Sequence, residues 1–243
     1  MEWHIIKLQE TRSTNTYLDS IDTECPQQEG CVVTTHTQSA GRGQRGNSWE
    51  AEPGKNLTFS YLLRPEGVAP QEQFILSQAV SLAVVDVLSR YAQGFSVKWP
   101  NDIYYHDSKI AGILIEHNLS GMSISRTIVG IGLNINQQQF ISDAPNPISL
   151  QQITGREYDL DAMLAEVLEA TTIRYAQCVG DRKQLQLDYA AALYRKDGFY
   201  PYRDAQGEFM ATIREVQPDG YLVLCDTEGR VRQYAFKEVA FII

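Results

Sequence analysis

The chain contains a polar turn that leads into a short apolar strand. Residues 98–102 read Lys-Trp-Pro-Asn-Asp, and Lys109 then opens the largely apolar run 110–116. This run is too short for anything but a strand. Charged and amide groups beside a buried strand cost free energy unless they meet a ligand or one another. The pattern therefore predicts a polar ligand site close to a buried strand.

An upstream segment supplies a flexible cationic loop. Residues 41–46 read Gly-Arg-Gly-Gln-Arg-Gly, and Trp49 follows. Glycines let a backbone close over a ligand, and guanidinium groups bind phosphate or carboxylate in a bidentate manner. The spacing matches neither the P-loop nor the dinucleotide fingerprint, because a strand follows where those motifs need a helix. A solvated glycine turn with incidental arginines is the alternative. Together with the polar turn, the loop favours a site for a negatively charged, phosphorylated small molecule.

Composition narrows the class of protein. The 243 residues suffice for one good-sized domain and a small one. The balance of 21 basic against 30 acidic residues gives a net charge of −9, which argues against a nucleic-acid partner. The four cysteines form no C-x-x-C pair, so we expect reduced thiols in a cytoplasmic protein, although a Cys25–Cys31 loop is an alternative. The apolar stretches fall short of the roughly 20 residues that span a bilayer, so no membrane partner is expected.

The order of the elements predicts an α+β fold. A short edge strand is expected at 5–8, and helical spacing predicts helices over 70–92, 160–178 and 182–194. Further strands are expected over 31–35, 57–63, 95–99, 110–116, 127–135, 207–216, 220–226 and 231–236. The last three form a terminal block of short hairpins, which is typical of a small β-barrel. We therefore expect a catalytic domain over 1–196 and a small β-barrel domain over 197–243.

Several motifs in this order resemble those of the biotin protein ligase family. They lie at 13–15, 37–46, 49, 98–102, 109–114 and 130–136, so the resemblance covers nearly the whole chain. It implies a class II synthetase-like catalytic domain, with a mixed β-sheet flanked by helices, and a small C-terminal SH3-like β-barrel. It also implies the single-function type of ligase, without an N-terminal DNA-binding domain.

The resemblance implies a two-step reaction. The carboxylate of biotin attacks the α-phosphorus of ATP to give biotinyl-5′-AMP and pyrophosphate. A specific lysine of a biotin carboxyl carrier protein domain, part of a biotin-dependent carboxylase, then takes the biotinyl group and releases AMP. Mg²⁺ is the implied cofactor, and Asp102 is its implied ligand. Whether the protein is a monomer or a homodimer stays open.

The same resemblance assigns roles residue by residue. The catalytic residues are Lys109, Arg42 and Asp102. The residues implied to bind biotin are Ser13, Thr14, Asn15, Gln38, Gly41, Arg42, Gly43, Gln44, Trp49, Lys109, Gly112 and Leu114. Those implied to bind ATP or the adenylate are Arg42, Arg45, Trp49, Asn101, Asp102 and Asn134.

One departure from the family pattern affects the glycine loop. Many members carry arginine where this chain has Gln44, and the neighbouring Arg45 is the candidate replacement. We expect Gln44 to affect retention of the adenylate modestly, whereas loss of Arg42 should be severe. Three other functions remain as alternatives: a related lipoate protein ligase, a non-catalytic biotin-binding protein and, least favoured, a nucleic-acid regulator.

Overall fold

The larger part of the protein is built on one seven-stranded sheet. The computed structural model describes residues 1–243 except 25, 45–47 and 142–145. The strand order is β1-β2-β3-β7-β6-β5-β4; β1 and β2 run parallel and every other neighbouring pair is antiparallel. The predicted mixed sheet and the edge position of β1 are therefore confirmed. The strands are β1 (His4–Thr11), β2 (Cys31–Gln38), β3 (Leu57–Leu63), β4 (Phe95–Lys98), β5 (Asp102–Tyr105), β6 (Ser108–Ser120) and β7 (Ser123–Leu133).

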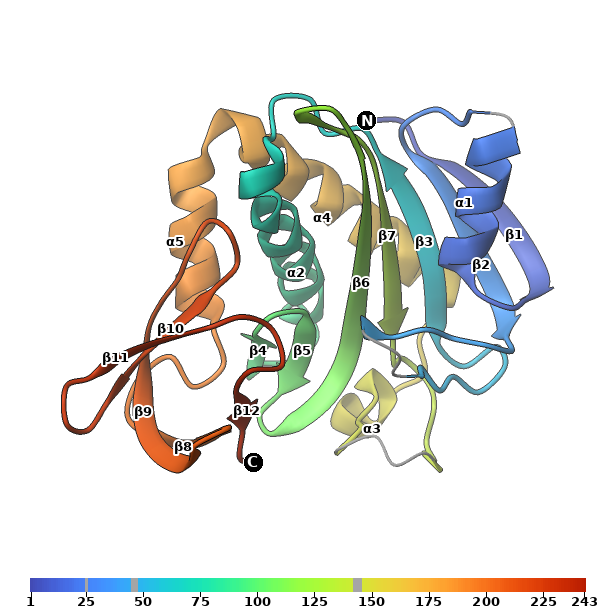
Figure 1. Cartoon of the computed structure of the whole chain (residues 1–243). Helices are drawn as coiled ribbons and strands as arrows, with labels where there is room; N and C mark the ends of the chain where they lie inside the picture. Colours follow the sequence, from blue (N-terminus) through green and yellow to red (C-terminus); the bar gives the residue numbers. More distant parts are fainter. Residues whose placement is uncertain (25, 45–47, 142–145) are drawn as a thin grey trace.

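Helices cover both faces of this sheet (Figure 1). On one face, α1 (Thr14–Glu24) packs on β2, β3 and β7. On the other face lies α2 (Phe74–Leu88), which packs against α4 (Leu160–Gly180) and α5 (Arg182–Ala192). The short elements η2 (Pro70–Glu72) and α3 (Leu150–Thr154) complete the helices of the described residues. Among those residues, no helix is both long and apolar enough to cross a membrane.

The central strand β3 shows how alternation divides the two faces. Side chains of successive strand residues point to opposite faces of a sheet. Phe59 and Tyr61 belong to the large core that includes α2 and α4, whereas Leu62 packs in a smaller cluster with Leu18 of α1. Ser60, two residues before Leu62, lies on the same face and has a much smaller side chain. A small polar residue at this buried position leaves room beside the N-terminus of α1.

The C-terminal residues form a second, fully antiparallel sheet. Its strand order is β11-β10-β9-β8-β12, which confirms the predicted small C-terminal β domain. The indole Nε1 of Trp99 donates to the backbone oxygen of Gly220 at 2.9 Å and thereby ties the polar turn to this sheet. The domain boundary at 196/197 stays a prediction. The strands are β8 (Tyr200–Asp204), β9 (Gly207–Val216), β10 (Leu222–Asp226), β11 (Val231–Tyr234) and β12 (Ala240–Phe241).

Several elements were not predicted. Strand β5 begins at Asp102, directly after a proline turn, and only its pairing with β4 and β6 gives it strand geometry. Strands β8 and β12 and helix α3 are short and carry no periodic pattern. The predicted helix over 70–92 is divided, since the 3₁₀ turn η2 precedes α2. Cys31, Cys178 and Cys225 are free thiols, and Cys25 lies outside the described residues.

Candidate active site

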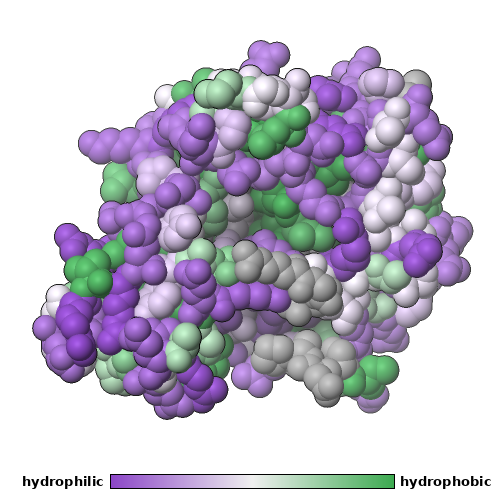
Figure 2. Space-filling view, in the orientation of Figure 1, coloured by the Kyte–Doolittle hydropathy of each residue, from purple (hydrophilic) through white to green (hydrophobic). Residues whose placement is uncertain are grey.

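A cavity of about 460 Å³ opens on the α1 side of the large sheet, next to the C-terminal sheet. This volume lies within the range of small-molecule sites. Figure 2 shows a depression near the middle of this face, with apolar residues exposed between polar ones. Its walls come from the start of α1, the loop after β2, the turn between β4 and β5, strands β6 and β7, and residues 236–241.

Glycines make the floor of the cavity. Gly112 of β6 and Gly132 of β7 are directly paired across the two strands. The indole of Trp49 lies on this pair: a Cβ added at Gly112 would stand 3.0 Å from the ring, and one added at Gly132 would collide with it. Glycine is required at these positions because a planar ring contacts the backbone itself.

The start of α1 supplies a buried polar wall. Ser13 caps the helix, since its hydroxyl accepts from the backbone N–H of Thr16 at 3.5 Å. The backbone N–H of Thr14 donates to Oε1 of Gln38 at 2.9 Å, which joins the helix start to the end of β2. Asn15 donates from Nδ2 to the backbone oxygen of Leu114 at 3.4 Å. Ser13, Thr14 and Asn15 are each less than a tenth exposed. Buried polar groups that lie together in this way are suited to binding a polar ligand.

Ser60 of the central strand supports this wall from behind. Its Oγ lies 2.6 Å from both Oγ1 of Thr14 and Oδ1 of Asn15. An amide oxygen only accepts, so the serine hydroxyl donates to Asn15 and accepts from Thr14. The orientation of the Asn15 amide is therefore set by its surroundings.

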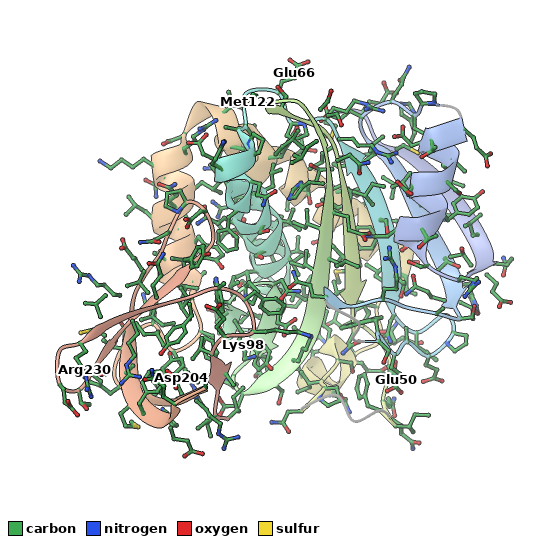
Figure 3. All side chains as sticks on the ribbon, in the orientation of Figure 1. Glu50, Glu66, Lys98, Met122, Asp204 and Arg230 are labelled. Carbon is green, nitrogen blue, oxygen red and sulfur yellow. The ribbon has the colours of Figure 1, made fainter. Side chains whose placement is uncertain are left out.

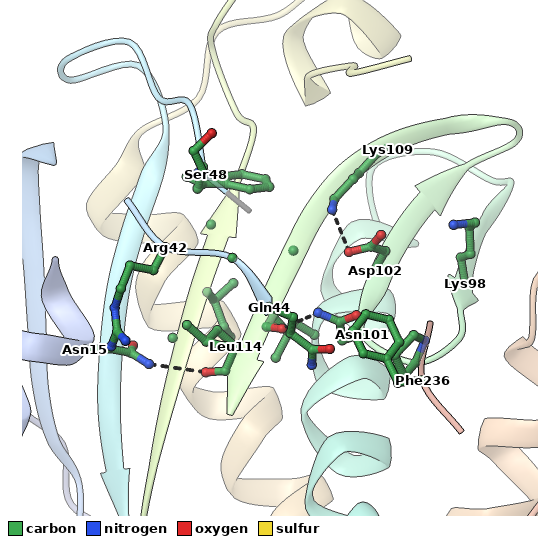
Figure 4. Close-up of a pocket in the computed structure, with 18 of the residues that line it drawn as sticks. Asn15, Arg42, Gln44, Ser48, Lys98, Asn101, Asp102, Lys109, Leu114 and Phe236 are labelled. Carbon is green, nitrogen blue, oxygen red and sulfur yellow. Dashed lines mark hydrogen bonds and ion pairs between the residues drawn. The ribbon is translucent and has the colours of Figure 1, made fainter. Parts of the chain in front are cut away.

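The opposite end of the cavity carries an ion pair. Nζ of Lys109 lies 2.6 Å from Oδ1 of Asp102, and both side chains are less than a quarter exposed (Figure 4). Asn101 is anchored twice to Ile113 of β6: its Nδ2 donates to the backbone oxygen at 2.6 Å, and its own backbone oxygen accepts from the N–H at 3.0 Å. The ammonium of Lys109 also lies 5.7 Å from the centre of the Trp49 ring. A cation at a cavity wall, held by a carboxylate, can stabilise an anionic reacting group.

Lys98 is a second cation at this end. Figure 3 places it where the β4–β5 turn meets the C-terminal sheet. Its Nζ lies 5.1 Å from the ring centre of Tyr104 and 5.2 Å from that of Phe241. Within the described part of the chain it has no carboxylate partner within 4 Å. Burial lowers the pKa of Lys98 below the ordinary lysine value, and the negative charge of Asp102 opposes this shift.

The structure brings most of the predicted site residues to one cavity. Gly41 does not line the wall; it approaches Gln38 and Trp49 too closely to carry a side chain. Asn134 also stands outside the wall, with Nδ2 donating to the backbone oxygen of Ile148 at 3.1 Å. Arg45 lies outside the described residues. The predicted residues that line the cavity are Ser13, Thr14, Asn15, Gln38, Arg42, Gly43, Gln44, Trp49, Asn101, Asp102, Lys109, Gly112 and Leu114.

Other wall residues were not predicted. Thr58 sits on a buried strand, where no sequence pattern indicates that its hydroxyl faces a cavity. Lys98 belongs to the polar turn, but no binding or catalytic role was predicted for it. The C-terminal segment contributes Phe236, Lys237 and Val239 to Phe241, although nothing in the hairpin pattern connects it to the turn.

A cavity with a polar wall, a glycine floor and a cationic end defines a site for a small anionic molecule. A model of the biotin/lipoate A/B protein ligase family matches residues 7–136, more than half of the chain, and the chain belongs to this family. The biotin--[acetyl-CoA-carboxylase] ligase of Paracoccus denitrificans is 33% identical over 183 residues, which cover 71% of this chain and 68% of that protein.

Two further comparisons extend over more of the chain. The bifunctional ligase/repressor BirA of Bacillus subtilis is 29% identical over 218 residues, which cover 85% of this chain. Those residues are 65% of that relative, so this chain spans somewhat less than two thirds of its length. The biotin protein ligase of Aquifex aeolicus, solved in complex with biotin and ATP, superposes with a TM-score of 0.76 at 25% identity and covers 98% of this chain and 97% of its own. The fold is therefore that of biotin protein ligases, with the C-terminal sheet included.

Proposed function

We propose that this protein is a biotin protein ligase, which joins biotin to ATP and then transfers the biotinyl group to a lysine of a carrier domain. In the first step a carboxylate oxygen of biotin attacks the α-phosphorus of ATP, and the bond to pyrophosphate breaks. In the second step the lysine amine attacks the carbonyl carbon of biotinyl-5′-AMP, the bond to AMP breaks, and the amine loses a proton. The carrier is a biotin carboxyl carrier protein domain of a biotin-dependent carboxylase.

One observation carries the proposal. A buried hydrogen-bonding wall and the Lys109–Asp102 pair, 2.6 Å apart, face opposite ends of the same cavity above a glycine floor. Biotin has a polar ureido group at one end and a carboxylate at the other, with an apolar ring between them. We assign the ureido group to the wall of Ser13, Thr14, Asn15 and Gln38, and the carboxylate to Lys109. Gly112 and Leu114 would contact the apolar ring.

The nucleotide would bind at the cationic end. We assign the phosphates to Lys98 and to the loop that carries Arg42, and a planar ring to Trp49. Asp102 is the residue that would hold Mg²⁺, because a single carboxylate together with substrate phosphates is a common donor set for this ion. Bound there, Mg²⁺ would neutralise charge on the phosphates. Among the described residues no cluster of three or more possible ligands exists, which fits a metal held partly by substrate.

The experiment that tests the function is ATP–pyrophosphate exchange, measured with biotin, with lipoate and with neither. Exchange that requires biotin would support the proposal. Lipoate is the informative control, because the family model spans biotin and lipoate ligases. Exchange driven by lipoate would move the assignment to that branch. Tight biotin binding without any exchange would mean that the site binds biotin without activating it.

Replacing Asp102 by asparagine should slow both half-reactions. The carboxylate holds Lys109 and is the candidate acceptor for the proton of the incoming lysine, and the amide retains its size but not its charge. We expect single-turnover adenylate formation and transfer each to slow about tenfold, with a smaller change in biotin affinity. Unchanged single-turnover rates would refute this role.

Replacing Lys98 by glutamine should raise the KM for ATP about fivefold and remove a pH dependence. Because burial lowers the pKa of Lys98, its ammonium loses its proton at a lower pH than an exposed lysine. The wild-type KM for ATP should therefore increase as the pH rises through that lowered pKa. In the glutamine variant this increase should disappear. A parallel pH profile in both proteins would show that Lys98 does not contact the phosphates.

A further inference from the structure

Glu116 stands at the rim of the cavity, on the floor strand β6. Alternation places it on the same face as Gly112 and Leu114, which line the cavity. Its side chain is 40% exposed. Glu116 ends the apolar run 110–116, but no role was predicted for it from the sequence.

A single oxygen of Glu116 receives two donors from different parts of the chain. Oε2 accepts from Nδ2 of Asn15 at 2.7 Å and from Nη2 of Arg42 at 2.9 Å. The first donor belongs to the buried wall at the start of α1, and the second to the loop after β2. One carboxylate therefore joins the polar wall to the cationic loop.

The contact with Asn15 sets the direction of its amide. Nδ2 has acceptors on both sides, Glu116 and the more distant backbone oxygen of Leu114 at 3.4 Å. Oδ1 accepts from Ser60 at 2.6 Å and lies so close to Gly130 that a Cβ there would collide with it. Glu116 provides the shorter of the two Nδ2 contacts, and together with Ser60 it holds Oδ1 toward the floor.

The contact with Glu116 holds the Arg42 side chain away from the charged end. Figure 4 shows Arg42 beside Asn15, across the cavity from Lys109 and Asp102. Nη2 of Arg42 is engaged by Glu116, so an incoming phosphate would compete with this carboxylate for the guanidinium. Glu116 thus engages the arginine that an anionic substrate would recruit.

We propose that Glu116 is a positioning residue that links the orientation of the Asn15 amide to the position of the Arg42 loop. It favours binding at the wall by orienting Asn15, and it restrains Arg42 until an anionic ligand competes for the guanidinium. The identity of that ligand rests on the function proposed above, but the restraint itself does not.

Two variants separate the two effects. Glu116→Gln keeps an acceptor for Asn15 but removes the charge that attracts Arg42, whereas Glu116→Ala removes both. Glu169→Gln, at an exposed position on α4, is the matched control. An exposed ion pair contributes little free energy. Loss of the pair between Arg42 and Glu116 should therefore change a measured rate or binding constant by at most about fivefold. The unfolding midpoint of each variant, which should match that of wild type, shows that the fold is retained.

The first measurement is amide hydrogen exchange in ligand-free protein, in peptides that cover residues 41–44. Glu116→Gln and Arg42→Gln should each speed exchange about threefold, and the double variant should add nothing further, because both changes break the same pair. The control should match wild type. Equal exchange in wild type and Glu116→Gln would overturn the restraint, whatever the protein's substrate is.

The second measurement separates the wall from the loop. Biotin Kd, measured by calorimetry, should rise about fivefold or more in Glu116→Ala and stay within twofold in Glu116→Gln. With biotin saturating, the KM for ATP should fall about threefold in Glu116→Gln. Equal losses of biotin affinity in both variants would overturn the role of the acceptor. Absence of biotin binding in wild type would instead refute the proposed function. The amide hydrogen-exchange data would still decide whether Glu116 restrains Arg42.

Discussion

Lys109→Gln should reduce biotin-dependent ATP–pyrophosphate exchange by about 10²- to 10³-fold. The ammonium is the cation that we place beside the reacting carboxylate, and removal of one preorganised charge-stabilising donor typically costs this much. The glutamine amide can still donate to Asp102, 2.6 Å from the wild-type ammonium, so the turn should keep its structure. The measurement is the initial rate of exchange at saturating biotin and ATP.

A surface lysine provides the control for this result. Lys55 forms an exposed ion pair with Glu157 at 3.5 Å and does not line the cavity, so Lys55→Gln should leave exchange unchanged. If Lys109→Gln retained more than a fifth of the wild-type rate, the ammonium would not stabilise the reacting group.

Gly132→Ala should raise the KM for biotin about 100-fold. The added methyl group collides with the indole of Trp49, or with any ligand ring that takes the same place on the floor. Overpacking of a closely fitted contact costs up to about 3 kcal/mol, which corresponds to this factor. The KM for biotin and the tryptophan fluorescence should change together, because the ring must move.

Gly180→Ala is the matched control, since a Cβ at Gly180 would meet nothing within 4 Å. It should leave the KM and the fluorescence at their wild-type values. A wild-type KM in Gly132→Ala, combined with altered fluorescence, would show that Trp49 and the floor are dispensable for biotin.

The fold could be predicted wherever the sequence has a strong local pattern. The alternating or apolar runs of β3, β6 and β7 are long enough to predict strands from local pattern alone. Helical spacing of apolar residues predicted α4 and α5. Strand β5 was missed because Asp102 and the proline before it carry the composition of a turn. Its geometry comes from neighbours on both sides, which a local pattern does not contain.

The candidate site was predicted in part, for a similar physical reason. Lys109 and Asp102 are close in sequence and on adjacent strands, so their proximity could be anticipated. Ser60 and Glu116 contact Asn15 across 45 and 101 residues, and no site role was predicted for either from the sequence. Such partners become visible only when the register of the sheet is known. The roles assigned to the clustered residues, and to Asn134 and Arg45, remain predictions.

The hydrogen bond between Trp99 and Gly220 has a consequence for how the site is completed during synthesis. A ribosome makes the chain from its N-terminus, so the polar turn at 98–102 leaves the exit tunnel long before the C-terminal sheet. Until residues 236–241 emerge, the nascent chain lacks one wall of its cavity. A nascent chain should therefore gain its full affinity for ligand in a single step, once residues 236–241 have emerged, rather than gradually as the large sheet assembles.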